Sequence, residues 1–191
     1  MAPPPAAQPT PPTATQSPQT PMNTRAGAYA VMVEGDSILL SRWVPRIAAL
    51  QPSWTLPGGG MELGEQPEQT AVREVFEETG HIVELQELLG VSSFYIAPEL
   101  RQSAGQGHLH ALRVIYRATV NGGTLTPEVG GSSDDARWIP LTDLKDLPVL
   151  DLVRVGLDLA GHNTEELGLA PEQLKAGTEQ RTAATEQGAT A

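Results

Sequence analysis

The chain has 191 residues, a net charge of −11 at pH 7 and no cysteine, which suits a single domain with tails. The lack of cysteine excludes disulfides, thiolate catalysis and Cys-ligated zinc or iron–sulfur sites. The acidic balance argues against a polymeric nucleic-acid partner, and without a long apolar run or a signal-peptide pattern we expect a cytoplasmic protein that does not bind membranes.

The two ends differ in composition from the middle of the chain. Residues 2–21 hold eight of the seventeen prolines and no Leu, Ile, Val or aromatic residue, so we expect residues 1–24 to form a disordered, proline-rich leader. Met22 follows directly, which leaves open the hypothesis that the native chain starts there. Residues 161–191 predict a polar, acidic C-terminal tail. The folded domain is therefore expected over residues 25–160.

Strand and helix patterns alternate along this domain. Residues 28–43, "AYAVMVEGDSILLSRW", predict two strands joined by a tight turn at Glu34-Gly35-Asp36. Further strands are predicted within residues 52–56 (running into a glycine loop), 81–97 (broken near Gly90), 108–120 and 135–141. Helical segments are predicted at residues 67–79, 141–147 and 150–160. This order predicts an α/β fold with a mixed sheet and helices packed against it.

The helix predicted at residues 67–79 has two distinct faces. Pro67 suits its first position, and Gly80 suits a left-handed cap at its C-terminus. An apolar stripe is expected from Val72, Val75, Phe76 and Thr79. A second, acidic stripe comes from Glu74, Glu77 and Glu78, at spacings of three and four residues.

A solvated face would explain an ordinary acidic stripe, but a bound cation explains this one better. The three carboxylates repel each other and oppose the helix macrodipole near the C-terminus. The helix also follows "LPGGG", a loop whose glycines let the backbone approach a ligand closely. Carboxylates with a backbone carbonyl form the oxygen-rich site that Mg²⁺ or Mn²⁺ prefers.

The spacing of these residues resembles the Nudix box, the signature of Nudix hydrolases. The pattern is Gly59, five residues, Glu65, seven residues, and then "REVFEETG" from Arg73 to Gly80. The box spans residues 59–81 and departs from the family only at His81, where a bulky aliphatic residue is usual. The resemblance implies the Nudix fold, an α/β/α sandwich with a mixed central β-sheet, and a Nudix hydrolase domain over residues 25–160.

The resemblance also implies roles for individual residues. Glu77, Glu78 and the carbonyl of Gly58 would bind the metal. Glu74 would be a ligand and the leading candidate for the base that activates water. The remaining implied roles are an orienting one for Arg73, a bracing or water-mediated one for Glu65, and contact of the substrate with Gly59.

Several assignments outside the box stay open. Some family members take the general base from a later loop, and Asp135 is the preferred candidate there over Glu128 and Asp134. Arg42, at the end of a strand, is a candidate for holding a phosphate. His108 and His110 share a strand face, for which packing or substrate contact is favoured over metal binding. Aromatic side chains that could stack on a base are Trp54, Phe94, Tyr95 and Trp138.

The expected function is metal-dependent hydrolysis of a nucleoside diphosphate linked to another moiety, with ADP-ribose-like compounds or (d)NTPs as substrates. The products would be a nucleoside monophosphate and a phosphorylated product or pyrophosphate. The alternative is a non-catalytic Nudix domain that acts as a nucleotide sensor. Isopentenyl diphosphate isomerase shares the fold but needs a catalytic cysteine, so it is excluded. A small nucleotide-derived partner is expected, and a homodimer is left open.

Overall fold

The structure is a computed structural model that describes residues 22–46, 50–98 and 107–169. The strands are β1 (Met22–Val31), β2 (Val33–Glu34), β3 (Ser37–Trp43), β4 (Ser53–Thr55), β5 (Gly58–Gly60), β6 (His81–Ile96), β7 (His108–Gly123) and β8 (Ser133–Pro140). The helices are α1 (Pro67–Thr79), the 3₁₀ helix η2 (Leu141–Asp146) and α2 (Asp151–Leu159). Most of the expected leader and of the expected tail lies outside the described residues, but Met22 already begins β1.

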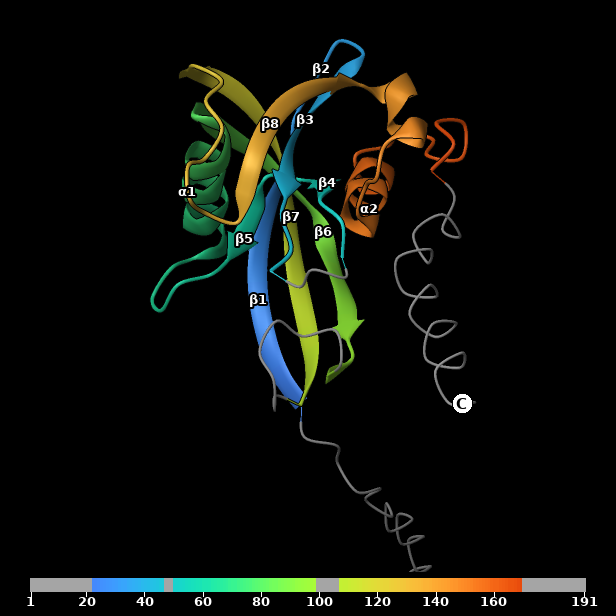
Figure 1. The fold of residues 1–191 in the computed structure, drawn as a ribbon. Coiled ribbons are helices and arrows are strands. Elements are labelled where there is room, and N and C mark those ends of the chain that lie inside the picture. Colours follow the sequence, from blue (N-terminus) through green and yellow to red (C-terminus); the bar gives the residue numbers. More distant parts are fainter. Residues whose placement is uncertain (1–21, 47–49, 99–106, 170–191) are drawn as a thin grey trace, which may run out of the picture.

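The strands form two sheets between α1 and α2 (Figure 1). The first sheet has the order β5-β1-β7-β6 and is mixed, because β1 runs parallel to β7 while the other pairs are antiparallel. In the second sheet, β3 pairs with β2, β4 and β8, all antiparallel. The prediction of an α/β fold with a mixed sheet is confirmed.

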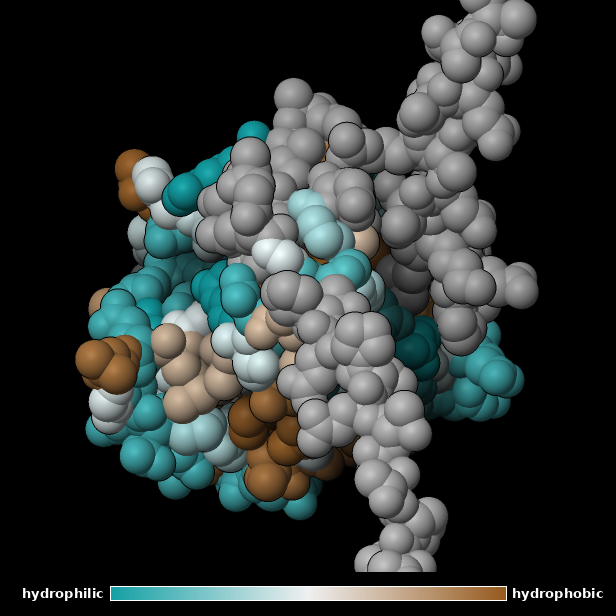
Figure 2. Space-filling view, turned by 90° about the horizontal axis from the view of Figure 1, so that it is seen from below, coloured by the Kyte–Doolittle hydropathy of each residue, from teal (hydrophilic) through white to brown (hydrophobic). Residues whose placement is uncertain are grey.

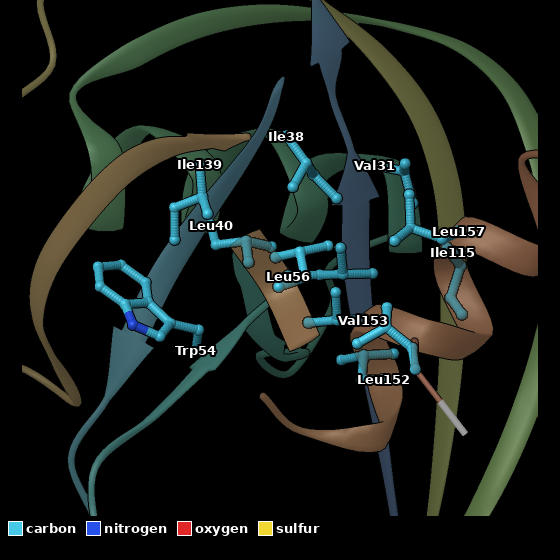
Figure 3. Packing of buried hydrophobic residues seen from close by; sticks show 12 residues of the cluster. Val31, Ile38, Leu40, Trp54, Leu56, Ile115, Ile139, Leu152, Val153 and Leu157 are labelled. Atoms are coloured by element: carbon cyan, nitrogen blue, oxygen red, sulfur yellow. The ribbon is translucent and has the colours of Figure 1, made fainter. Parts of the chain in front are cut away.

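Alternation along the strands divides the core into two parts. The larger cluster lies on the α2 side and includes Val31, Ile38, Leu40, Trp54, Leu56, Ile115, Ile139, Leu152, Val153 and Leu157 (Figure 3). The second cluster, on the α1 side, contains Ala30, Met32, Leu39, Val75, Val83 and Ala118. Ala30 and Val31, neighbours in β1, thus face opposite layers, as expected for a strand buried on both faces.

Helix α1 has the predicted bounds, Pro67–Thr79, and Gly80 caps it with the predicted left-handed conformation at φ 72°. The predicted apolar stripe is only half right. Val75 and Thr79 are buried, but Val72 and Phe76 are exposed. The buried face of α1 instead runs through Ala71, Val75 and Glu78, and this rotation carries one glutamate into the protein.

Two other strand predictions differ from the structure. The glycine loop is itself a strand, β5, which pairs with β1 through Gly27↔Gly60 and Tyr29↔Gly58. The strand signal near Gly90 is not a break, because β6 continues through it with a register shift between Leu88 and Gly90. A Cβ at Gly90 would lie 3.1 Å from Leu159 of α2, so the missing side chain lets the helix pack closely on β6.

None of the helices within the described residues is long and apolar enough to cross a membrane. Seen from below, most of the described surface is hydrophilic, with a few hydrophobic groups between hydrophilic neighbours (Figure 2).

Candidate active site

Glu78 is the buried centre of the acidic stripe, with only 3% of its surface exposed. Its Oε2 accepts hydrogen bonds from the backbone N–H of Gly58 (3.0 Å) and the hydroxyl of Ser41 (2.9 Å). Its Oε1 accepts one from the hydroxyl of Ser133 (2.8 Å). A buried carboxylate needs such partners, and they fix this one between β3, β5 and β8. In the sequence, Ser41 is marked only as a polar residue that follows the apolar run of residues 38–40 in β3.

Arg73 holds the other acidic residues of the box together. Its guanidinium donates to both carboxylate oxygens of Glu65, at 2.6 and 2.9 Å. Its Nη1 donates to Glu74 and to Glu77, both at 3.0 Å. Nη2 also reaches the carbonyl of Gly60 at 3.3 Å. One planar donor fork thus sets the positions of three glutamates, a geometry that lysine could not reproduce.

The glycines of β5 make room for this cluster. A Cβ at Gly59 would lie 2.6 Å from the carboxylate of Glu74, closer than any real contact. Gly58 has φ 143°, and a Cβ there would meet the backbone of Tyr29 at 2.6 Å. Glycine is therefore required at position 58, whereas a side chain at position 59 would displace the carboxylate of Glu74. The backbone of β5 lies directly against this carboxylate.

The environment shifts the acidity of the cluster in two directions. Burial raises the pKa of Glu78 to about 7, although its three hydrogen bonds act in the opposite sense. Burial also raises the pKa of Glu74, against the lowering effect of Arg73. The hydrogen bonds from Arg73 lower the pKa of Glu65 to about 2. The ionised forms of Glu74 and Glu78 are therefore disfavoured by burial, whereas Glu65 is ionised at neutral pH.

Glu128 is the loop acid that the structure brings to the cluster. Its charge contributes to the raised pKa of Glu74. Its Oε2 accepts a hydrogen bond from the backbone N–H of Ser133, whose hydroxyl binds Glu78. Glu77 and Glu128 also line a cavity of about 450 Å³ together with Phe76, Gly80, Thr124, Thr126, Pro127 and Val129. From the sequence alone, Asp135 is preferred over Glu128 as the loop acid.

The structure does not bring Arg42 and Asp135 to the glutamates. Because Ser41 points to Glu78, its neighbour Arg42 points to the opposite face of the second sheet. There it forms a two-pronged ion pair with Asp134, at 2.8 and 3.0 Å. Asp135 lies in β8, not in a loop, and pairs with Arg137 at 2.6 Å. Arg42 and Arg137 line a separate cavity of about 810 Å³ beside the ring of Trp54.

The contacts of His108 and of the candidate aromatic residues Phe94, Tyr95 and Trp138 are with residues other than the glutamates. His108 stacks on Tyr95 and hydrogen bonds to its hydroxyl. Phe94 lies under the guanidinium of Arg113, 5.3 Å from it. Trp138 packs with the core on the α1 side, where its ring lies 6.3 Å from that of His81. His81, the unusual residue of the box, is buried, and its Nε2 has no hydrogen-bond partner among the residues that the structure describes.

The donor set fits a hard divalent cation, although no three acidic or histidine side chains in the described part of the chain converge on one point. Burial disfavours the ionised forms of Glu74 and Glu78. The negative charges of Glu77 and Glu128 further disfavour the ionised form of Glu74. A divalent cation would offset this repulsion, and oxygen ligands are the ones that Mg²⁺ and Mn²⁺ prefer.

The chain is similar in sequence to a known domain and to several known proteins. The NUDIX domain matches residues 23–154. An ADP-ribose pyrophosphatase of Methanocaldococcus jannaschii is 38% identical over 97 residues, which cover 51% of this chain and 50% of the relative. A putative 8-oxo-dGTP diphosphatase of Bacillus subtilis is 41% identical over 70 residues, which cover 37% of this chain and 44% of the relative. The chain thus spans half or less of the length of these two relatives.

Solved structures agree with this comparison. The crystal structure of a MutT NUDIX hydrolase from Burkholderia pseudomallei has a TM-score of 0.57 at 26% identity and covers 72% of this chain and 98% of that one. A NUDIX hydrolase from Nitrosomonas europaea, at 22% identity, shares the fold with a TM-score of 0.53 and covers 85% of this chain and 90% of that one. Since the NUDIX domain matches residues 23–154, more than half of the chain, this chain belongs to the Nudix hydrolase family.

Proposed function

We propose that the protein hydrolyses a diphosphate linkage in a nucleoside diphosphate derivative, with Mg²⁺ or Mn²⁺ as cofactor. The substrate class is a nucleoside diphosphate joined to another moiety, either ADP-ribose-like or a (d)NTP. The products are a nucleoside monophosphate and a phosphorylated compound or pyrophosphate. The observation that carries the proposal is the set of box carboxylates held by Arg73 against the glycine backbone of β5.

The carboxylates of Glu74, Glu77 and Glu78, with the carbonyl of Gly58, would hold the metal. When bound, the metal supplies charge neutralisation at the phosphoryl oxygens and a lowered pKa of the attacking water. Arg73 keeps Glu74 and Glu77 in place, and Glu65 in turn anchors Arg73 through two hydrogen bonds. Gly59 allows the substrate and the carboxylate of Glu74 to approach the same stretch of backbone.

Glu74 is the proposed general base. Its pKa is raised by burial, and a base is most effective when its pKa lies close to the working pH. Its side chain remains partly accessible, with 16% of it exposed, whereas Glu78 is only 3% exposed and accepts three hydrogen bonds. Glu128 is the candidate from the later loop, because it lies close enough to Glu74 to affect its pKa.

The proposal is tested by a hydrolysis panel with Mg²⁺ and with Mn²⁺. ADP-ribose, NADH, dinucleoside polyphosphates, canonical and oxidised dNTPs and nucleotide sugars are incubated with the full chain, and the products are identified by chromatography. One substrate with a clear margin in kcat/KM is the expected result. Tight metal-dependent binding without turnover would overturn the proposal in favour of a nucleotide sensor.

A further inference from the structure

Arg25 belongs to β1, and its side chain lies against the neighbouring glycine strand β5, which borders the carboxylate cluster. It is two residues from Gly27, which pairs with Gly60 of β5. A Cβ at Gly60 would meet the Arg25 side chain, at 2.7 Å from Nε and 2.9 Å from Cζ. The guanidinium is thus folded over the backbone of β5, although Arg25 as a whole is exposed to solvent. Glycine at position 60 makes this conformation possible.

The side chains of Arg25 and Glu74 pack against opposite faces of the short strand β5. Successive residues of a strand point to opposite faces, and Gly59 faces Glu74 while Gly60 faces Arg25. β5 is the edge strand of the mixed sheet, so no further strand of that sheet covers its outer side. Because β5 carries no side chains, a ligand at this edge can contact groups on both faces.

The side chain of Arg25 is also free to bind an anion. Its guanidinium forms no hydrogen bond or ion pair with the described residues, whereas the other arginines around the site are engaged. Arg73 is bound to three glutamates and Arg42 to Asp134. Arg113 is buried and donates to Ser92. Burial raises the pKa of the Tyr29 hydroxyl, and the charges of Arg25, Arg113, Glu78 and Glu74 also act on it. Arg25 and the two glutamates are therefore neighbours of the same side chain.

A cation at this position would favour the binding of a diphosphate. Glu65, Glu74, Glu77 and Glu78 together would repel the phosphoryl oxygens of an approaching substrate. A guanidinium binds non-bridging phosphate oxygens through short, charge-assisted hydrogen bonds and presents several donors in one plane. We propose that Arg25 binds the diphosphate of the substrate at the edge of β5, on the face opposite Glu74. This inference rests on the proposed function and adds a substrate-binding residue outside the Nudix box.

The test compares Arg25→Ala and Arg25→Lys with the wild-type chain. The first readout is the dissociation constant of methylenediphosphonate in the presence of Mg²⁺, measured by calorimetry, because its P–C–P bridge cannot be hydrolysed. We expect Arg25→Ala to weaken binding about 10- to 100-fold, the range for a lost charge-assisted hydrogen bond, and Arg25→Lys to weaken it less. Arg117→Ala is the matched control, since Arg117 also lies in a strand and is partly exposed but pairs with Glu87.

The second readout is the affinity for Mn²⁺ alone, followed by electron paramagnetic resonance. It is expected to be unchanged in Arg25→Ala, because Arg25 does not contact the carboxylates. If no substrate of the hydrolysis panel is cleaved but methylenediphosphonate still binds, the proposed function is refuted and the role of Arg25 is not. Equal methylenediphosphonate affinity in wild type and Arg25→Ala, absence of binding by the wild type, or a matching loss in Arg117→Ala would overturn the role of Arg25.

Discussion

Gly59 and Glu74 are in such close contact that a single methyl group at position 59 would lie 2.6 Å from the carboxylate. Glu74 is held from its other side by Arg73, whose Nη1 lies 3.0 Å from Oε1. The carboxylate therefore has no room to retreat without breaking this ion pair. The shape of the backbone and the position of the proposed base are coupled.

We predict that Gly59→Ala lowers kcat about 100-fold, since a displacement of about 1 Å in a catalytic group has an effect of this size. Gly122→Ala is the matched control, because a Cβ at Gly122 of β7 meets no atom within 4 Å. The measurement is kcat and KM on the best substrate of the panel, with circular dichroism to check the fold. Equal kcat in the two variants would show that the contact with Glu74 does not matter for turnover.

Glu74→Gln and Glu78→Gln are each predicted to lower kcat by about 10²- to 10⁴-fold while the fold survives. The amide keeps the size of the side chain but removes the charge that the metal needs and, at Glu74, the basic oxygen. Glu62→Gln, in the exposed loop before α1, is the control and is expected to keep wild-type turnover. Full activity in both box variants would refute the site assignment.

Much of the fold and the site could be predicted from sequence because periodicity and spacing encode them locally. The bounds of α1, the cap at Gly80 and the box glutamates all follow from residues close in the chain. The partners of Glu78 could not be predicted this way. Ser41 and Ser133 are 37 and 55 residues from it, and only the pairing of β3 with β8 brings them together.

Long-range packing also decides which face of α1 is buried and where the side chain of Asp135 lies. Phe76 reads as a core residue by its chemistry, yet the sheet lies against Ala71, Val75 and Glu78 instead. Asp135 reads as a loop acid because glycines and serines precede it. Its strand pairs with β3, and this pairing directs Asp135 toward Arg137 rather than toward the glutamates.

The buried position of Glu78 predicts a pH-dependent stability of the metal-free protein. Its pKa rises from 4.5 to about 7 on folding, so between these values the folded chain binds more protons than the unfolded chain. The free energy of unfolding therefore falls as the pH rises through this window, by at most on the order of 3 kcal/mol. Urea denaturation in EDTA at about pH 5 and about pH 8 measures this change. Glu78→Gln is expected to flatten it, and an equally steep change in that variant would assign the effect to another group.

Glu128 and Asp135, the two candidate acids that follow β7, are expected to differ in their effect on turnover. Glu128 raises the pKa of Glu74 through its charge, so Glu128→Gln is predicted to lower that pKa. If Glu74 is the base, the acidic limb of the pH profile of kcat moves to lower pH in this variant. A fall in kcat of more than about tenfold at all pH values would instead make Glu128 the base. Asp135→Asn is expected to leave both the profile and kcat unchanged, because Asp135 pairs with Arg137 and not with the residues of the glutamate cluster. A loss of activity in Asp135→Asn that exceeds the loss in Glu128→Gln would contradict this arrangement and restore Asp135 as the loop base.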